Sequence, residues 1–204
     1  IWTTDHQLIN ISFSDPVTPT QFPAIEIPGK LIGISHQGQV IYTSGYSFDD
    51  DGGRIPNSLH LHASAYDEVQ VSLVDSMPLT SNLAGTLSLD SGIIISRHLE
   101  DGLYEITPLK LLNSGELIFE AGFSHDSYPH SLIQVDGLVL IPNNFGSGIT
   151  AVDFNAGSKP VIFEEWNFPG CVYAPIKNIS GTKKDGFWSP MGVYGINHLA
   201  PPSN

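Results

Sequence analysis

The clearest structural pattern in the chain is the stretch Ser131-Leu-Ile-Gln-Val-Asp-Gly-Leu-Val-Leu-Ile-Pro142. Two short apolar segments flank the turn residues Asp136-Gly137, which predicts two strands, 131–135 and 138–142. Two more short apolar segments follow at 149–154 and 160–166, each bounded by turn residues. Four short strands in a row predict one small antiparallel sheet.

The same pattern, a turn glycine followed by an apolar strand, occurs four times along the chain. The four turn glycines, separated by 45 to 54 residues, are Gly38, Gly92, Gly137 and Gly186. A second strand follows each glycine, at 58–62, 102–106, 148–152 and 192–196. A period of this length is the size of a β-propeller blade. Blades stack because one four-stranded sheet cannot bury both of its faces alone.

We therefore predict that residues 1–204 are all-β and consist of propeller blades of four antiparallel strands. Full blades are expected at 29–80, 81–124 and 125–169, and partial blades at 1–28 and 170–204. The strands expected in the partial blades are 7–13 and 23–27 at one end, and 172–177, 187–191 and 193–198 at the other. These ends do not combine into one closing blade, which would leave open strand edges. The chain is expected to be the C-terminal part of a larger propeller, with its other blades upstream or in another chain.

The composition also favours strands over helices. Charged residues make up 14% of the chain, well below the roughly 25% of an average soluble domain. The best candidate for a helix, 108–120, is interrupted by Asn113-Ser114-Gly115, which predicts a hairpin turn instead.

The charge of the chain limits its partners and its location. The formal net charge is −13, from 21 acidic and 8 basic residues, so the chain repels nucleic acids and anionic membrane surfaces. No apolar run is long enough to span a bilayer. The chain begins at Ile1, which indicates a removed signal peptide or missing upstream sequence, and we expect an extracellular or periplasmic protein. The single cysteine, Cys171, is expected to be a small buried hydrophobic residue.

Several segments resemble known bacterial propellers. Leu8-Ile-Asn-Ile-Ser-Phe-Ser-Asp-Pro-Val-Thr-Pro19, followed by Ile25-Glu-Ile-Pro-Gly29, resembles the repeat of secreted propellers of the LVIVD type, in which a strand ends in a Ser-Asp-Pro turn. Tyr128-Pro-His-Ser-Leu-Ile-Gln-Val-Asp-Gly137 and Gly148-Ile-Thr-Ala-Val-Asp153 are similar to blades of YVTN and quinoprotein-like propellers. The blades lack the alternating tryptophans of quinoprotein dehydrogenases, so no quinone cofactor is expected.

Two groups of residues are candidate metal ligands. Asp49, Asp50 and Asp51 precede Gly52-Gly53, and closely spaced carboxylates on a glycine-rich turn can bind Ca²⁺. The alternative is a solvated insertion between two strands. His60 and His62 share a face of their strand, but no third ligand for a transition metal is evident nearby.

The candidate ligand-binding residues are His125, Asp126, Tyr128 and His130. They lie in the connection between two blades, and in a propeller this connection lines the funnel at one end of the central channel. Asp126 could orient an imidazole for acid–base chemistry. The alternative is a role in turn hydrogen bonding and packing between blades. His36 and Asp90 are expected in turns at the opposite end.

The chain contains no recognisable nucleophile elbow, phosphate-binding glycine loop or pair of catalytic carboxylates, so no catalytic residue is assigned. We expect a non-catalytic extracellular propeller that acts as a structural or interaction platform. The alternative is a hydrolase or lactonase-like enzyme with a metal-assisted site in the axial funnel.

Overall fold

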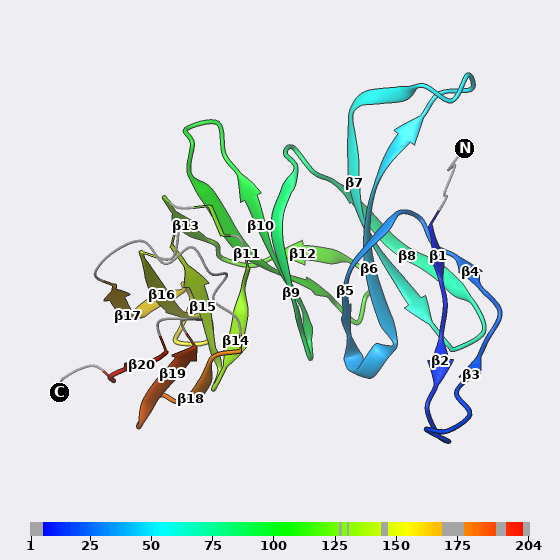
Figure 1. The fold of residues 1–204 in the computed structure, drawn as a ribbon. Coiled ribbons are helices and arrows are strands. Elements are labelled where there is room, and N and C mark those ends of the chain that lie inside the picture. The colour runs from blue at the N-terminus through cyan, green and yellow to red at the C-terminus, as the bar shows by residue number, and fades with distance from the viewer. Residues whose placement is uncertain are drawn as a thin grey trace. The chain divides into compact units, whose positions relative to one another are not determined.

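The computed structural model describes residues 6–126, 128–129, 131–143, 147–168, 178–190 and 195–201. Within these ranges the chain forms antiparallel sheets and one 3₁₀ turn, η1 (His36–Gly38), with no α-helix (Figure 1). The prediction of an all-β chain is confirmed. None of these residues lies in a helix long and apolar enough to cross a membrane.

The chain divides into two compact units. The first comprises Ile1–Asn82, Ser88–Ile93 and Leu109–Ile118, and the second comprises Leu83–Leu87, Ile94–Pro108 and Phe119–Asn204.

A two-stranded hairpin opens the described part of the first unit. Its paired strands are β1 (Gln7–Leu8) with β4 (Ile25–Glu26), and β2 (Ile11–Ser12) with β3 (Thr20–Gln21). The turn between them is held by Asp15, whose carboxylate accepts hydrogen bonds from the Val17 amide at 2.9 Å and the Thr18 hydroxyl at 2.6 Å. These bonds, above all the one from Thr18, lower the pKa of Asp15. The Ser-Asp-Pro segment is therefore a side-chain-capped turn.

The first large sheet has the strand order β5-β6-β7-β8, with every neighbouring pair antiparallel. Its strands are β5 (Lys30–Ser35), β6 (Val40–Phe48), β7 (Arg54–Tyr66) and β8 (Val71–Pro78). The expected insertion at 47–54 is a continuation of the β6–β7 hairpin, because Phe48 still pairs with Arg54.

The second large sheet contains β9 to β13. Its strands are β9 (Leu83–Leu89), β10 (Gly92–His98), β11 (Tyr104–Leu111), β12 (Leu117–Phe119) and β13 (Phe123–His125). The order is β12-β11-β10-β9, and β13 also pairs with β11. The predicted turn at 113–115 is confirmed, with a hydrogen bond from the Leu112 amide to the Glu116 carbonyl at 2.9 Å. The outermost position is thus shared by two short strands.

The third sheet has the order β14-β15-β16-β17, and the fourth has the order β18-β19-β20. Their bounds are β14 (Ile133–Val135), β15 (Leu138–Pro142), β16 (Gly148–Asp153), β17 (Val161–Asn167), β18 (Ser180–Thr182), β19 (Gly186–Pro190) and β20 (Ile196–Leu199). The strand expected at 172–177 lies outside the described residues, and the strand that pairs with β19 is β18. Asp136 and Gly137 both have positive φ, at 46° and 74°, as a two-residue hairpin turn requires.

The middle strands of the three large sheets are buried on both faces. All five residues of β15 are buried, as are the first five of β16, whereas β14 and β17 contain no buried residue. The same contrast separates the first four residues of β6, which are buried, from β8 at the edge of the same sheet, and the first five residues of β10 from its neighbour β9. A sheet with two buried faces needs a layer of structure on each side. A continuous apolar run such as Leu-Val-Leu-Ile presents apolar side chains to both of these layers.

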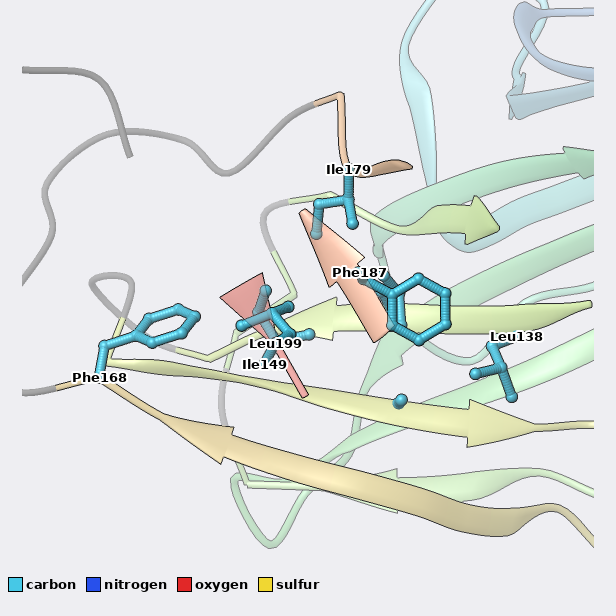
Figure 2. Packing of buried hydrophobic residues seen from close by; sticks show 8 residues of the cluster. Leu138, Ile149, Phe168, Ile179, Phe187 and Leu199 are labelled. Carbon is cyan, nitrogen blue, oxygen red and sulfur yellow. The ribbon is translucent and has the colours of Figure 1, made fainter. Parts of the chain in front are cut away.

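One such contact between layers is visible in the second unit. Figure 2 shows Leu138 and Ile149, from the third sheet, packed with Phe187 and Leu199 from the fourth. The third and fourth sheets therefore share one hydrophobic core. The arrangement of all the sheets into a propeller stays a prediction.

Candidate functional site

Among the residues predicted to bind a ligand, His125 is the last residue of β13 and is buried, whereas Asp126 and Tyr128 are exposed. His125 is buried and pairs with Tyr104 across β13 and β11. Its Nε2 atom lies 3.2 Å from Asn143 Oδ1 and 3.4 Å from Thr150 Oγ1. Because an amide oxygen only accepts, Nε2 carries the proton and donates to Asn143. His125 thus connects the second sheet to the ends of β15 and β16.

Tyr128 takes part in a second contact between the same two sheets. Its hydroxyl donates to the Ala84 carbonyl at 3.3 Å. Its ring meets the Tyr104 ring edge-on at 5.3 Å, and Tyr104 in turn meets His98 at 5.1 Å. These contacts hold Tyr128 against residues of β9 and β11, and Tyr104 in turn against β10.

The two remaining members of the predicted cluster are Asp126 and His130. Asp126 is exposed, and His130 lies outside the described residues. The structure places both His125 and Tyr128 beside Tyr104, and it adds Asn143 and Thr150 as partners of His125, which the sequence did not single out. The sequence gives little indication of a role for Asn143 and Thr150, because they lie just after and within apolar strands and resemble ordinary strand residues.

An ion pair lies in the same part of the second sheet. Arg97 on β10 pairs with Glu105 on β11, and its guanidinium lies over the Phe119 ring at 4.5 Å from the centroid. The two opposite charges compensate each other, and the ring covers one side of the guanidinium.

In the Asp49–Asp51 turn, the carboxylate of Asp49 accepts hydrogen bonds from backbone amides of the same turn. Asp49 Oδ1 accepts hydrogen bonds from the Gly53 amide at 2.6 Å and the Asp51 amide at 3.2 Å. All three aspartates are exposed. Within the described ranges, no three or more His, Cys, Asp or Glu side chains are grouped so that they could hold a metal ion. Calcium binding at this turn stays a prediction, without geometric support from converging carboxylates.

His60 and His62 share a face of β7, as predicted, with their rings stacked and their centroids 6.2 Å apart. His62 is completely buried. Burial, together with the nearby charge of His60, lowers the pKa of His62 to about 4. His62 is therefore a neutral core residue at physiological pH, opposite Thr43 in the pairing of β6 with β7.

The turns between the first two strands of successive sheets contact each other. In the first unit, the His36 amide donates to the Asp90 carbonyl at 2.8 Å. In the second unit, the Lys183 amide donates to Asp136 Oδ2 at 2.6 Å, and Lys183 Nζ donates to Asp153 Oδ2 at 2.7 Å. His36 and Asp90 lie in turns, as expected, and their contact is a structural one.

Comparison with known proteins supplies a fold but no activity. No known protein family matches the sequence, and no curated protein does. A functionally unknown protein from Desulfotomaculum acetoxidans DSM 771 has a similar structure, with a TM-score of 0.60 and 12% sequence identity over 90% of this chain. The match spans only 55% of that protein. At this identity the similarity concerns the fold alone.

Proposed function

We propose that this chain supplies a run of β-propeller blades of the LVIVD or YVTN type and acts as a non-catalytic structural or interaction platform outside the cell. The observation that carries the proposal is the repeated sheet. Three successive sheets have an antiparallel order that follows the chain, with middle strands buried on both faces. Radial stacking of blades is an arrangement that covers both faces of every sheet.

The contacts of His125 and Tyr128 favour the platform over an enzyme, because both side chains join one sheet to another. His125 is buried and bonded to Asn143, and Tyr128 is bonded to the backbone of Ala84. A general base would need its free nitrogen within reach of a substrate. These side chains instead fix one sheet to the next.

The extent of the structural match supports a larger assembly. The protein from Desulfotomaculum acetoxidans continues well beyond the part that this chain resembles. A chain that corresponds to just over half of a longer protein of this fold is expected to need further sheets to complete a ring.

Electron microscopy of the purified protein in its assembled form tests the architecture. We expect disc-shaped particles with a central channel. A sandwich or an elongated stack of sheets would contradict the propeller.

A His125→Ala variant tests the platform. We expect a loss of about 1 to 3 kcal/mol in the free energy of unfolding, because Asn143 would lose a buried partner. We expect no change in turnover when a panel of esters and lactones is assayed with both proteins. Turnover that His125→Ala abolishes while the protein remains folded would favour the hydrolase or lactonase instead.

A further inference from the structure

The third and fourth sheets have the same register, which defines equivalent positions in the two. Strands β15 and β19 are each five residues long and end in a proline. The prolines pair with Ile149 in the third sheet and with Ile196 in the fourth. Leu140 and Trp188 therefore occupy the same position in successive sheets.

Another repeated position lies at the end of the outer strand, where one residue bonds to the backbone of the neighbouring strand. Leu79 follows β8 and Phe168 follows β17, and the amide of each donates to a backbone carbonyl at 2.8 Å. Ile27 follows β4, and its amide makes the same kind of bond at 3.1 Å. His125 ends β13 and pairs with Tyr104 in β11. This position, named the closing position below, is held by Ile27, Leu79, His125 and Phe168.

The closing position is buried in all four cases, but its chemistry differs in one of them. The exposed fraction of the residue ranges from 3% for Ile27 to 9% for Phe168. Three of the residues are apolar, and Phe168 belongs to the core that the third and fourth sheets share. His125 places an imidazole at the same position. A buried polar group costs free energy unless it is hydrogen-bonded, so His125 requires a polar partner.

The third sheet supplies this partner. His125 Nε2 lies 3.2 Å from Asn143 Oδ1 and 3.4 Å from Thr150 Oγ1, and the Thr150 hydroxyl donates to Asn143 Oδ1 at 3.3 Å. Thr150 is 2% exposed and lies in a strand whose other buried residues are Gly148, Ile149, Ala151 and Val152. The polar residue of the second sheet thus meets the polar residues of the third.

An apolar residue at the closing position would fit the third sheet less well. A side chain such as that of Phe168 would cover Asn143 and Thr150 without supplying the donor that His125 supplies, and a buried polar group that loses its partner destabilises the contact. Conversely, His125 would be buried without an acceptor against a purely apolar layer. Each mismatch costs free energy, whereas the observed pairing satisfies both sheets.

We propose that His125 is a specificity-determining residue of the repeat, which directs the second sheet to the third sheet in preference to other sheets of the same kind. This inference rests on the proposed repeat of blades. Repeats of similar shape can stack on the wrong neighbour during folding, which is a characteristic failure of repeat proteins. A polar pair at one junction penalises such errors, as a buried asparagine fixes the register of a coiled coil.

Refolding of the full-length chain from urea separates this role from a contribution to stability. The test variant combines His125→Leu, which installs the residue found at position 79, with Thr150→Val, which removes the hydroxyl that would lose its partner. Its urea midpoint should stay close to that of the wild type, because matched apolar groups replace matched polar groups. Its fraction of native, monodisperse protein after rapid dilution should fall at least twofold, as measured by size-exclusion chromatography with light scattering and by limited proteolysis.

Phe168→Leu is the matched control, because it places the same residue at the closing position of the next sheet, where the original residue is already apolar. It should lower the urea midpoint and leave the native fraction after refolding unchanged. His125→Gln is the conservative variant. Its side-chain amide retains an N–H donor for Asn143, so it should refold with nearly the native fraction of the wild type.

Two results would overturn the proposal. They are a double variant that refolds to the same native fraction as the wild type, and a Phe168→Leu variant that loses as much native fraction as the double variant. Should the double variant fail to fold even after slow dialysis, Thr150→Val alone replaces it, with the same expectation and a smaller loss. Disc-shaped wild-type particles together with an unchanged native fraction would contradict this inference alone, whereas particles of another shape would contradict the propeller.

Discussion

The third and fourth sheets share one register but not one environment. Strand β15 is buried along its whole length, whereas β19 alternates between buried and exposed residues beyond its first position. Their sequences differ accordingly, Leu-Val-Leu-Ile-Pro against Gly-Phe-Trp-Ser-Pro. A continuous apolar run marks a strand between two layers, and an interrupted one marks a strand with a single layer. The difference indicates that burial in this protein depends on the neighbouring sheet.

The largest expected effect comes from equivalent positions in the two sheets. Leu140→Ala should lower the free energy of unfolding by about 2 to 5 kcal/mol, because it leaves a cavity in a closed core. Trp188→Ala should cost no more than about 1 kcal/mol in the monomer, because its side chain is half exposed. Urea unfolding at low protein concentration measures both. Equal losses would mean that the fourth sheet is covered as fully as the third.

A second test uses His62 to measure how fully the first sheet is shielded from solvent. Its pKa of about 4 in the folded protein lies below the ordinary value of 6.5, so the unfolded chain binds the proton more readily. The free energy of unfolding should therefore be unaffected above about pH 6.5 and fall as the pH decreases toward 4, by about 1.4 kcal/mol per pH unit and about 3 kcal/mol in total.

The matched variants are His62→Gln and His60→Gln. The first should remove this part of the pH dependence. The second should retain most of it, because burial lowers the pKa of His62 more than His60 does. Thermal melts across the pH range measure the slopes. A slope that His62→Gln does not reduce would show that solvent reaches the imidazole.

Much of the fold could be predicted from the sequence because turn residues and apolar runs alternate clearly. The strands expected at 138–142 and 149–154 lie within one residue of β15 and β16, since Asp136-Gly137 fixes one end of the hairpin. The fourth sheet was predicted less well. The pairing of β18 with β19 depends on Ser180-Gly-Thr182, a polar segment with no apolar pattern. The outer strand of the second sheet is divided in two by its pairing, which no local pattern indicates.

The candidate site could be predicted only in part. His125 and Tyr128 were identified from their place before a strand, but their partners Asn143 and Ala84 are distant in sequence and come together only through packing of the sheets. The Asp49 turn was read from its carboxylates. Its hydrogen bonds to Gly53 and Asp51 are local, but the choice between backbone and metal as partner depends on turn geometry.

The smallest expected effect concerns the polar contact between the third and fourth sheets. Lys183 Nζ lies 2.7 Å from Asp153 Oδ2, and both side chains are partly exposed. Partial burial raises the pKa of Asp153, but hydrogen bonds from Lys183 and the Asn155 amide outweigh it and the pKa is lowered. A double-mutant cycle with Lys183→Met and Asp153→Asn should give a coupling of no more than about 1 kcal/mol, reduced by salt. A larger coupling energy would mean that the ion pair contributes more to the contact between the third and fourth sheets than we infer from its partial exposure.

We infer that the third and fourth sheets are two copies of one repeat, which differ only in whether a further sheet covers them. A high-resolution structure of the complete propeller proposed above would test this inference. We expect Trp188 and Ile196 to be buried against another β-sheet, as Leu140 and Ile149 are buried against Phe187 and Leu199. Trp188 and Ile196 facing solvent in the complete propeller would contradict the inference.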